Sequence, residues 1–193
     1  MKIKEAIKLA ESRWLNLFDI RWVDKSGNDR SWQMVSRQSE PKYFTGQFEP
    51  GDAVVVVPYH TGYDKLVVTR EFRVPLGDYE YGFPAGLIEK GESVEQATRR
   101  ELTEETGLTV ARFTRISPPV YTTTGISDES VVMVYVECTG EPTSRFNTRS
   151  EVIEVILVSS RDAETLCSKK DLKFDAKAWL VILNYAASGK HSL

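Results

Sequence analysis

The chain has 193 residues, of which 41% are hydrophobic and 27% are charged, with a net charge of −3 and a pI near 5.6. This composition excludes a disordered or fibrous protein and is typical of one well-packed core with appendages. Since there is no overall basic field, we expect no nucleic-acid partner, and a negatively charged substrate would need local arginines or metal ions. The two cysteines have neither metal-site nor disulfide-rich spacing, which indicates reduced thiols.

No targeting or membrane-spanning segment is evident in the sequence. The opening Met-Lys-Ile-Lys-Glu-Ala lacks an apolar signal core, and no window reaches the roughly 18 apolar residues of a membrane span. We therefore expect a cytoplasmic protein without a membrane partner.

The first predicted elements form an extension ahead of the main domain. Residues 2–14 are compatible with a helix, and residues 16–23 and 31–38 alternate like strands around the turn cluster 24–28. We expect residues 1–48 to form this helix and β-hairpin.

The remaining segments predict one catalytic domain over residues 49–193. Its expected elements are strands at 53–58, 65–69, 111–117, 131–138 and 152–158, a helix near 93–107, and a C-terminal helix at about 172–187. Strands on both sides of a central helix, with another helix at the end, favour an α/β/α sandwich around a mixed β-sheet.

The central helix has clear start and stop signals. Ser93, followed three residues later by Gln96, predicts a capping box, and Gly107 predicts the left-handed residue that ends the helix. Between these signals the helix should have about four turns.

Three carboxylates lie on one face of this helix. Glu101, Glu104 and Glu105 stand at positions i, i+3 and i+4, so their side chains converge. Their mutual repulsion, on the order of a few tenths of a kcal/mol per pair, becomes useful if divalent cations bind there. Carboxylate oxygens suit hard ions, so Mg²⁺ is the first candidate and Mn²⁺ the second.

The segment that contains these carboxylates resembles the Nudix box, G-x5-E-x7-R-E-U-x-E-E-x-G-U, in which U is aliphatic. All defined positions match: Gly86, Glu92, Arg100, Glu101, Leu102, Glu104, Glu105, Gly107 and Leu108. A solvated acidic helix would explain the charges, but not both glycines and the arginine at their spacings. The resemblance covers about one eighth of the chain and implies the Nudix fold.

The resemblance also implies roles for the box residues. Glu101 and Glu105 would be the main metal ligands, supported by Glu92, Glu104 and the backbone carbonyl of Ala85, around roughly two or three ions. Arg100 would pair with Glu92 or a neighbouring carboxylate and orient it. Gly86 would let the loop bend closely around whatever the carboxylates bind.

The residues around the box are similar to those of ADP-ribose pyrophosphatases and nucleoside diphosphate sugar hydrolases. Arg73 and the run Phe83-Pro84-Ala85-Gly86 match that branch. The strand Trp32-x-x-Val35-x-Arg37 looks like the one that provides an aromatic plane for adenine and an arginine for the diphosphate. A core tryptophan and ordinary surface ion pairs are the alternative readings.

In this branch the hairpin commonly reaches across a dimer. We therefore expect a homodimer in which Trp32 serves the active site of the partner subunit.

Two glutamates are candidates for the general base. Glu151 lies in Glu151-Val-Ile-Glu154-Val, which resembles the segment that contains the base in this branch, and it is the first choice. Glu129 is the rival, because the family often has an acidic residue soon after a glycine such as Gly125. Either is otherwise an ordinary solvated carboxylate.

The expected reaction is metal-dependent hydrolysis of a pyrophosphate linkage, with ADP-ribose giving AMP and ribose 5-phosphate. The chain has Thr123-Thr124-Gly125 where many ADP-ribose pyrophosphatases have Ser-Pro-Gly, so GDP-mannose and ADP-glucose stay open. A Nudix-type sensor without catalysis is a further alternative, although sensors commonly have broken carboxylate sets and this box is intact.

Overall fold

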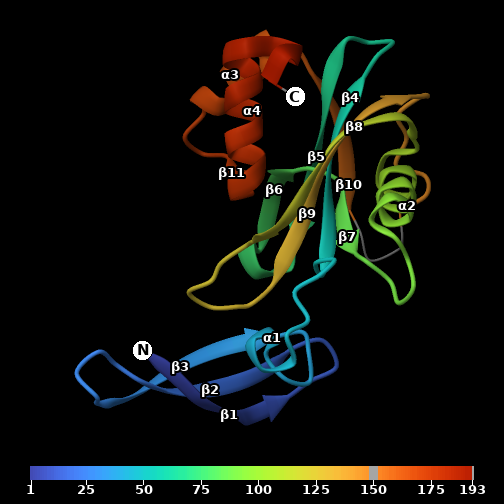
Figure 1. Cartoon of the computed structure of the whole chain (residues 1–193). Coiled ribbons are helices and arrows are strands. Elements are labelled where there is room, and N and C mark those ends of the chain that lie inside the picture. The colour runs from blue at the N-terminus through green and yellow to red at the C-terminus, as the bar shows by residue number, and fades with distance from the viewer. Residues whose placement is uncertain (148–151, 193) are drawn as a thin grey trace. The chain divides into compact units, whose positions relative to one another are not determined.

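The computed structural model describes residues 1–147 and 152–192 (Figure 1). The chain forms two compact units. The first unit consists of residues 1–52 and 119–131, and the second unit of residues 53–118 and 132–193. No helix within the described residues is both long enough and apolar enough to cross a membrane.

The first unit is built on a three-stranded antiparallel sheet in the order β1-β2-β3. Its elements are β1 (Lys2–Glu11), β2 (Asn16–Val23), β3 (Asp29–Ser36) and the short helix α1 (Lys42–Thr45). The predicted hairpin is therefore confirmed. The loop before β9 joins the same unit, because the Val35 amide donates to the Ile126 carbonyl at 2.8 Å.

The expected helix over residues 2–14 is wrong, because residues 2–11 form β1 and pair with β2. Ile3 and Ala6 are half-buried and three residues apart, a spacing that is typical of a helix. A register shift between Ile3 and Glu5 inserts an extra residue, so that both side chains lie on one face of a strand. The bulge thus produces a helical spacing in extended chain.

The second unit is built on an eight-stranded sheet, in the order β11-β6-β5-β4-β9-β8 with β10 on β5 and β7 on β4. The strands are β4 (Ala53–His60), β5 (Lys65–Arg73), β6 (Asp78–Gly82), β7 (Ala85–Leu87), β8 (Thr109–Tyr121), β9 (Ser130–Thr139), β10 (Ile153–Val158) and β11 (Lys173–Phe174). The helices are η1 (Val74–Leu76), α2 (Val94–Thr106), α3 (Ser160–Ser168), α4 (Ala176–Ser188) and η2 (Gly189–Ser192). The sheet is mixed, because β11 is parallel to β6 while β5 is antiparallel to β6.

Helices cover both faces of this sheet (Figure 1). On one face, Val54 of β4 and Val134 of β9 share a buried cluster with Leu102 of α2. On the other face, the ring of Tyr59 lies 6.3 Å from that of Tyr185 in α4. Successive side chains of β4 thus point to opposite faces of the sheet and pack into two separate cores. The predicted α/β/α sandwich is confirmed.

The helix α2 begins and ends where the sequence predicts. The Ser93 side chain accepts a hydrogen bond from the Gln96 amide, the Gln96 side chain accepts one from the Ser93 amide, and Gly107 is left-handed with φ 71°. The sequence did not predict α3, or the short strands β6 and β7.

Candidate active site

The box glutamates differ in how far solvent reaches them. Glu101 and Glu105 are each 8% exposed, although both are charged residues on a helix. Glu104 is exposed on the same helix. Carboxylates are seldom buried without partners, and the partners here include Arg100 of α2 itself and the backbone amide of Ala85 in β7.

Arg100 holds the loop and helix together. Its guanidinium donates two hydrogen bonds of 2.9 Å to the two carboxylate oxygens of Glu92 and one of 2.5 Å to Glu101 Oε1. It also reaches Glu104 Oε2 at 3.4 Å and the Leu87 carbonyl at 2.9 Å. The predicted contact between Arg100 and Glu92 is therefore present, in the fork geometry that fixes both side chains.

These contacts shift the pKa values of both partners. The hydrogen bonds to Glu92, followed by those to Glu101, raise the pKa of Arg100 above its ordinary value despite its burial. The hydrogen bond from Arg100 lowers the pKa of Glu92. Both groups are consequently charged at neutral pH.

The strand β7 brings the box glycine against the acidic helix. A Cβ atom on Gly86 would lie 1.8 Å from Glu101 Oε1, so the Glu101 carboxylate would have to move to make room for it. The neighbouring Ala85 amide donates to Glu105 Oε1 at 3.3 Å. The register of β7 on β4, with Ala85 opposite Val55, thus places this backbone beside both buried carboxylates.

Arg73 lies at the end of β5 among acidic side chains. Its Nη1 donates to both Glu71 oxygens at 3.0 Å, and its Nε lies 3.7 Å from Glu80 Oε2. Burial alone would lower the pKa of Arg73, but Glu71, Glu80 and Glu105 together raise it. The sequence interpretation missed Glu71, although its i, i+2 spacing from Arg73 on a strand was a usable signal.

Three other predicted residues lie in the first unit. Trp32 is 52% exposed, and its indole N–H donates to the Gly125 carbonyl at 3.2 Å. Arg37 Nε donates to Glu129 Oε1 at 2.6 Å, so a predicted substrate ligand and a predicted base pair with each other. Glu151, the first choice for the base, lies outside the described residues.

The side chains of the box fit a hard divalent cation in their chemistry. They offer carboxylate oxygens from Glu101, Glu104 and Glu105 beside a backbone that Gly86 leaves open. Among residues 1–147 and 152–192, no three acidic, histidine or cysteine side chains are already gathered around one ion position. Arg100 contacts two of these three glutamates, so its guanidinium holds positive charge where a cation would bind.

Buried carboxylates beside an orienting arginine, on an α/β/α sandwich, are typical of metal-assisted hydrolases. The chain belongs to the NUDIX domain family, whose model matches residues 49–180. It is accordingly a pyrophosphohydrolase, and Nudix hydrolases generally depend on divalent metal ions. The family prediction from the box is confirmed.

Several relatives extend this similarity. The ADP-sugar pyrophosphatase of Mus musculus is 30% identical over 196 residues, covering 95% of this chain and 85% of that protein. The ADP-ribose pyrophosphatase of Bacillus subtilis is 36% identical over 129 residues, covering 66% and 68%. A crystal structure of an ADP compounds hydrolase matches the fold with a TM-score of 0.72 at 22% identity, covering 100% of this chain and 96% of that chain.

Proposed function

We propose that the protein hydrolyses the pyrophosphate linkage of ADP-ribose, releasing AMP and ribose 5-phosphate. The observation that carries this proposal is the assembled box, in which Gly86 meets Glu101 and Arg100 connects the loop to the carboxylates. The substrate class is supported by the relatives named ADP-sugar and ADP-ribose pyrophosphatase.

The proposed metal ligands are Glu101 and Glu105, with Glu92, Glu104 and the Ala85 carbonyl in support. Roughly two or three bound Mg²⁺ ions, or Mn²⁺ in their place, would neutralise the diphosphate and lower the pKa of a water molecule. Arg100 keeps the carboxylates oriented through its contacts with Glu92 and Glu101.

Arginines of the chain supply further positive charge for a diphosphate. Arg73 has a planar fork of donors, which suits phosphate oxygens, and its positive charge is secured by the surrounding glutamates. Arg37 would serve the same purpose after exchanging Glu129 for a phosphate. Because Glu129 already accepts a hydrogen bond from Arg37, we propose Glu151 as the general base.

A related substrate is the second candidate. The loop Thr123-Thr124-Gly125 departs from the Ser-Pro-Gly of many ADP-ribose pyrophosphatases, and this difference favours testing GDP-mannose and ADP-glucose alongside ADP-ribose. All these compounds share the linkage that the box would cleave.

The experiment is a substrate panel of ADP-ribose, ADP-glucose and GDP-mannose, assayed with Mg²⁺ for release of the nucleoside monophosphate. We expect ADP-ribose to give the highest kcat/KM. Glu105→Gln keeps the shape of the side chain and removes its charge, so turnover should fall by about two orders of magnitude or more. The matched control is Glu95→Gln, which makes the same change at an exposed position of α2 and should leave turnover unchanged.

Two results would contradict the proposal. If no compound released nucleoside monophosphate, the proposed catalytic function would be wrong. If Glu105→Gln turned over at the normal rate, Glu105 would not be a metal ligand of the site. A circular dichroism spectrum of each variant establishes that the fold is intact.

A further inference from the structure

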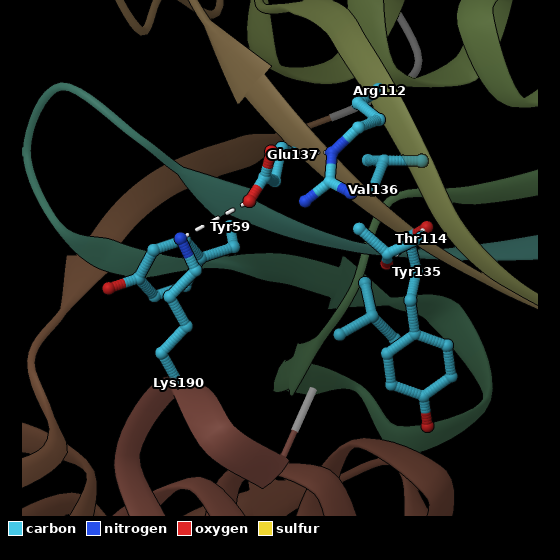
Figure 2. Close-up of a pocket in the computed structure, with 8 residues that line it drawn as sticks. Tyr59, Arg112, Thr114, Tyr135, Val136, Glu137 and Lys190 are labelled. Carbon is cyan, nitrogen blue, oxygen red and sulfur yellow. Dashed lines mark hydrogen bonds and ion pairs between the residues drawn. The ribbon is translucent and has the colours of Figure 1, made fainter.

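A hollow lies on the sheet face opposite α2, in the second unit (Figure 2). Its volume is about 210 Å³, and it is lined by residues of β4, β8 and β9 and by the C-terminal η2. The β4 side chains in its wall, Val57 and Tyr59, alternate with Val54 and Val56, which pack toward α2. The hollow is therefore separate from the box.

Two cations and one carboxylate meet in this hollow. Arg112 Nε donates to Glu137 Oε2 at 3.0 Å, and Lys190 Nζ lies 3.2 Å from Glu137 Oε1. In Figure 2, Glu137 lies between the other two side chains. The hydrogen bonds from Arg112 and Lys190 lower the pKa of Glu137 to about 2, so the cluster carries one net positive charge at neutral pH.

The cations retain donors for a ligand. Arg112 donates to Glu137 from its Nε, and within residues 1–147 and 152–192 its two terminal nitrogens make no hydrogen bond, so they can donate to a ligand. The Arg112 side chain is 65% exposed and the Lys190 side chain is 50% exposed. An anion from solvent can therefore contact both without a rearrangement of the strands around the hollow. Arginine and lysine side chains are both common ligands of phosphate.

The rest of the wall is aromatic and hydroxylated. Tyr59 is buried in the floor, with Lys190 Nζ 4.8 Å from the centre of its ring. Thr114 and Tyr135 line the side of the hollow, and the Thr114 hydroxyl donates to the Tyr135 carbonyl at 3.0 Å. Aromatic rings beside hydroxyl groups and a carboxylate match a sugar, which has both C–H faces and hydroxyl groups.

The size of the hollow limits the ligand. Pockets that enclose drug-sized ligands occupy about 300–1,000 Å³, so a whole nucleotide would project from this one. A phosphate with a single small sugar fills it.

We propose that this hollow binds a phosphorylated monosaccharide, of the size of a pentose phosphate. The phosphate contacts Arg112 and Lys190, while Glu137 and Thr114 hydrogen-bond to the sugar hydroxyls and Tyr135 covers the ring. This assignment does not depend on the proposed function, since none of these residues belongs to the box.

The experiment is isothermal titration calorimetry with ribose 5-phosphate as the probe, on metal-free protein in EDTA. The wild-type chain should bind the probe, and Arg112→Gln or Lys190→Gln should weaken binding by about tenfold or more, as expected for loss of a charged hydrogen bond. Arg115→Gln is the matched control, because it removes the same charge from another exposed position of β8 and should bind like wild type. Glu105→Gln should also bind like wild type, which separates this site from the box.

Inorganic phosphate tests the sugar part of the proposal. We expect it to bind about tenfold more weakly than ribose 5-phosphate in the wild type, and Glu137→Gln should reduce this difference. The proposal is overturned by absence of binding, by equal binding in Arg112→Gln or Lys190→Gln, or by phosphate binding as tightly as the sugar phosphate. Melting temperatures of the variants close to wild type show that the wall is intact.

Discussion

Gly86 shows how a single residue controls the geometry of the acidic site. Replacing it with alanine would place a Cβ atom 1.8 Å from the present position of Glu101 Oε1. We expect Gly86→Ala to displace Glu101 and to lower kcat/KM by about a hundredfold, since a displacement of about 1 Å can cost that much. Steady-state kinetics with ADP-ribose measures the loss.

The matched control for this change is Gly82→Ala in β6. A Cβ atom on Gly82 would meet the Thr69 hydroxyl at 3.8 Å, which is an ordinary contact. This variant should therefore retain activity close to wild type. Equal activity in both variants would show that the close approach of Gly86 to Glu101 has no part in turnover.

Single residues were predictable where a short motif contains both partners. Arg100 and Glu92 lie within one box, so the resemblance alone predicts that Arg100 pairs with Glu92 or a neighbouring carboxylate. Lys42 gives no such signal in the sequence. Its buried ammonium depends on Asp52, ten residues away, and on Ser130, which only the folded chain brings close.

In the turn between β2 and β3, neighbouring residues in the sequence donate hydrogen bonds to the carboxylate of Asp24. Asp24 Oδ1 accepts hydrogen bonds from the Ser26 amide at 2.8 Å and the Asn28 amide at 3.0 Å, and Arg30 donates to Oδ2 at 2.9 Å. The Asn28 amide is the largest contribution that lowers the pKa of Asp24 from 3.8 to about 2.

A lowered folded-state pKa makes this turn sensitive to acid. The contribution of Asp24 to stability is complete above its unfolded pKa of 3.8 and is lost as the pH falls through about 2. We expect Asp24→Ala to have a lower melting temperature than wild type at pH 7, and the difference to narrow below about pH 4. Thermal melts of both proteins between about pH 2 and pH 7 test this prediction. A difference in melting temperature that stays constant over this range would contradict it.

Elements were predictable where local chemistry fixes their ends. The helix α2 has its cap and its terminating glycine in the sequence, and its bounds follow from them. The sequence of β1 predicts a helix instead of a strand, because a bulge in the strand gives its half-buried residues a helical spacing. The short strands β6 and β7 have no periodic sequence pattern that predicts them. They form by pairing with β5 and β4, which the sequence of either segment does not show.

A buried ion pair ties the helix α1 to the rest of the first unit. Lys42 Nζ lies 2.5 Å from Asp52 Oδ2 and 2.9 Å from Ser130 Oγ, with the lysine side chain 3% exposed. Lys42→Met leaves Asp52 buried without its cation, so we expect a loss of about 3–5 kcal/mol in the free energy of unfolding. Urea denaturation measures this change.

The control is an exposed ion pair in the same unit. Lys4 and Asp29 have side chains that are 47% and 77% exposed, so Lys4→Met should cost about 1 kcal/mol or less. If both lysine variants lose the same small free energy of unfolding, the burial of Lys42 does not contribute to stability.

At the scale of the whole molecule, the first unit exposes many large apolar side chains. Ile7, Leu9, Trp14, Trp32 and Tyr43 are all exposed in it. Solvent-facing apolar groups of this number favour a protein interface. We propose that the protein forms a homodimer through this unit, and sedimentation equilibrium measures the oligomeric state directly.

We predict that in this proposed homodimer Trp32 serves the active site of the partner subunit, and two defective variants test that prediction together. Trp32→Ala alone should raise KM more than it lowers kcat, because stacking on the base is lost. Mixed with Glu105→Gln after unfolding and refolding together, it should form dimers in which one site has both an intact box and an intact Trp32. Activity with wild-type KM then reappears in the mixture. If Trp32 instead serves its own subunit, every intact box keeps the alanine, and the mixture shows only the raised KM of Trp32→Ala.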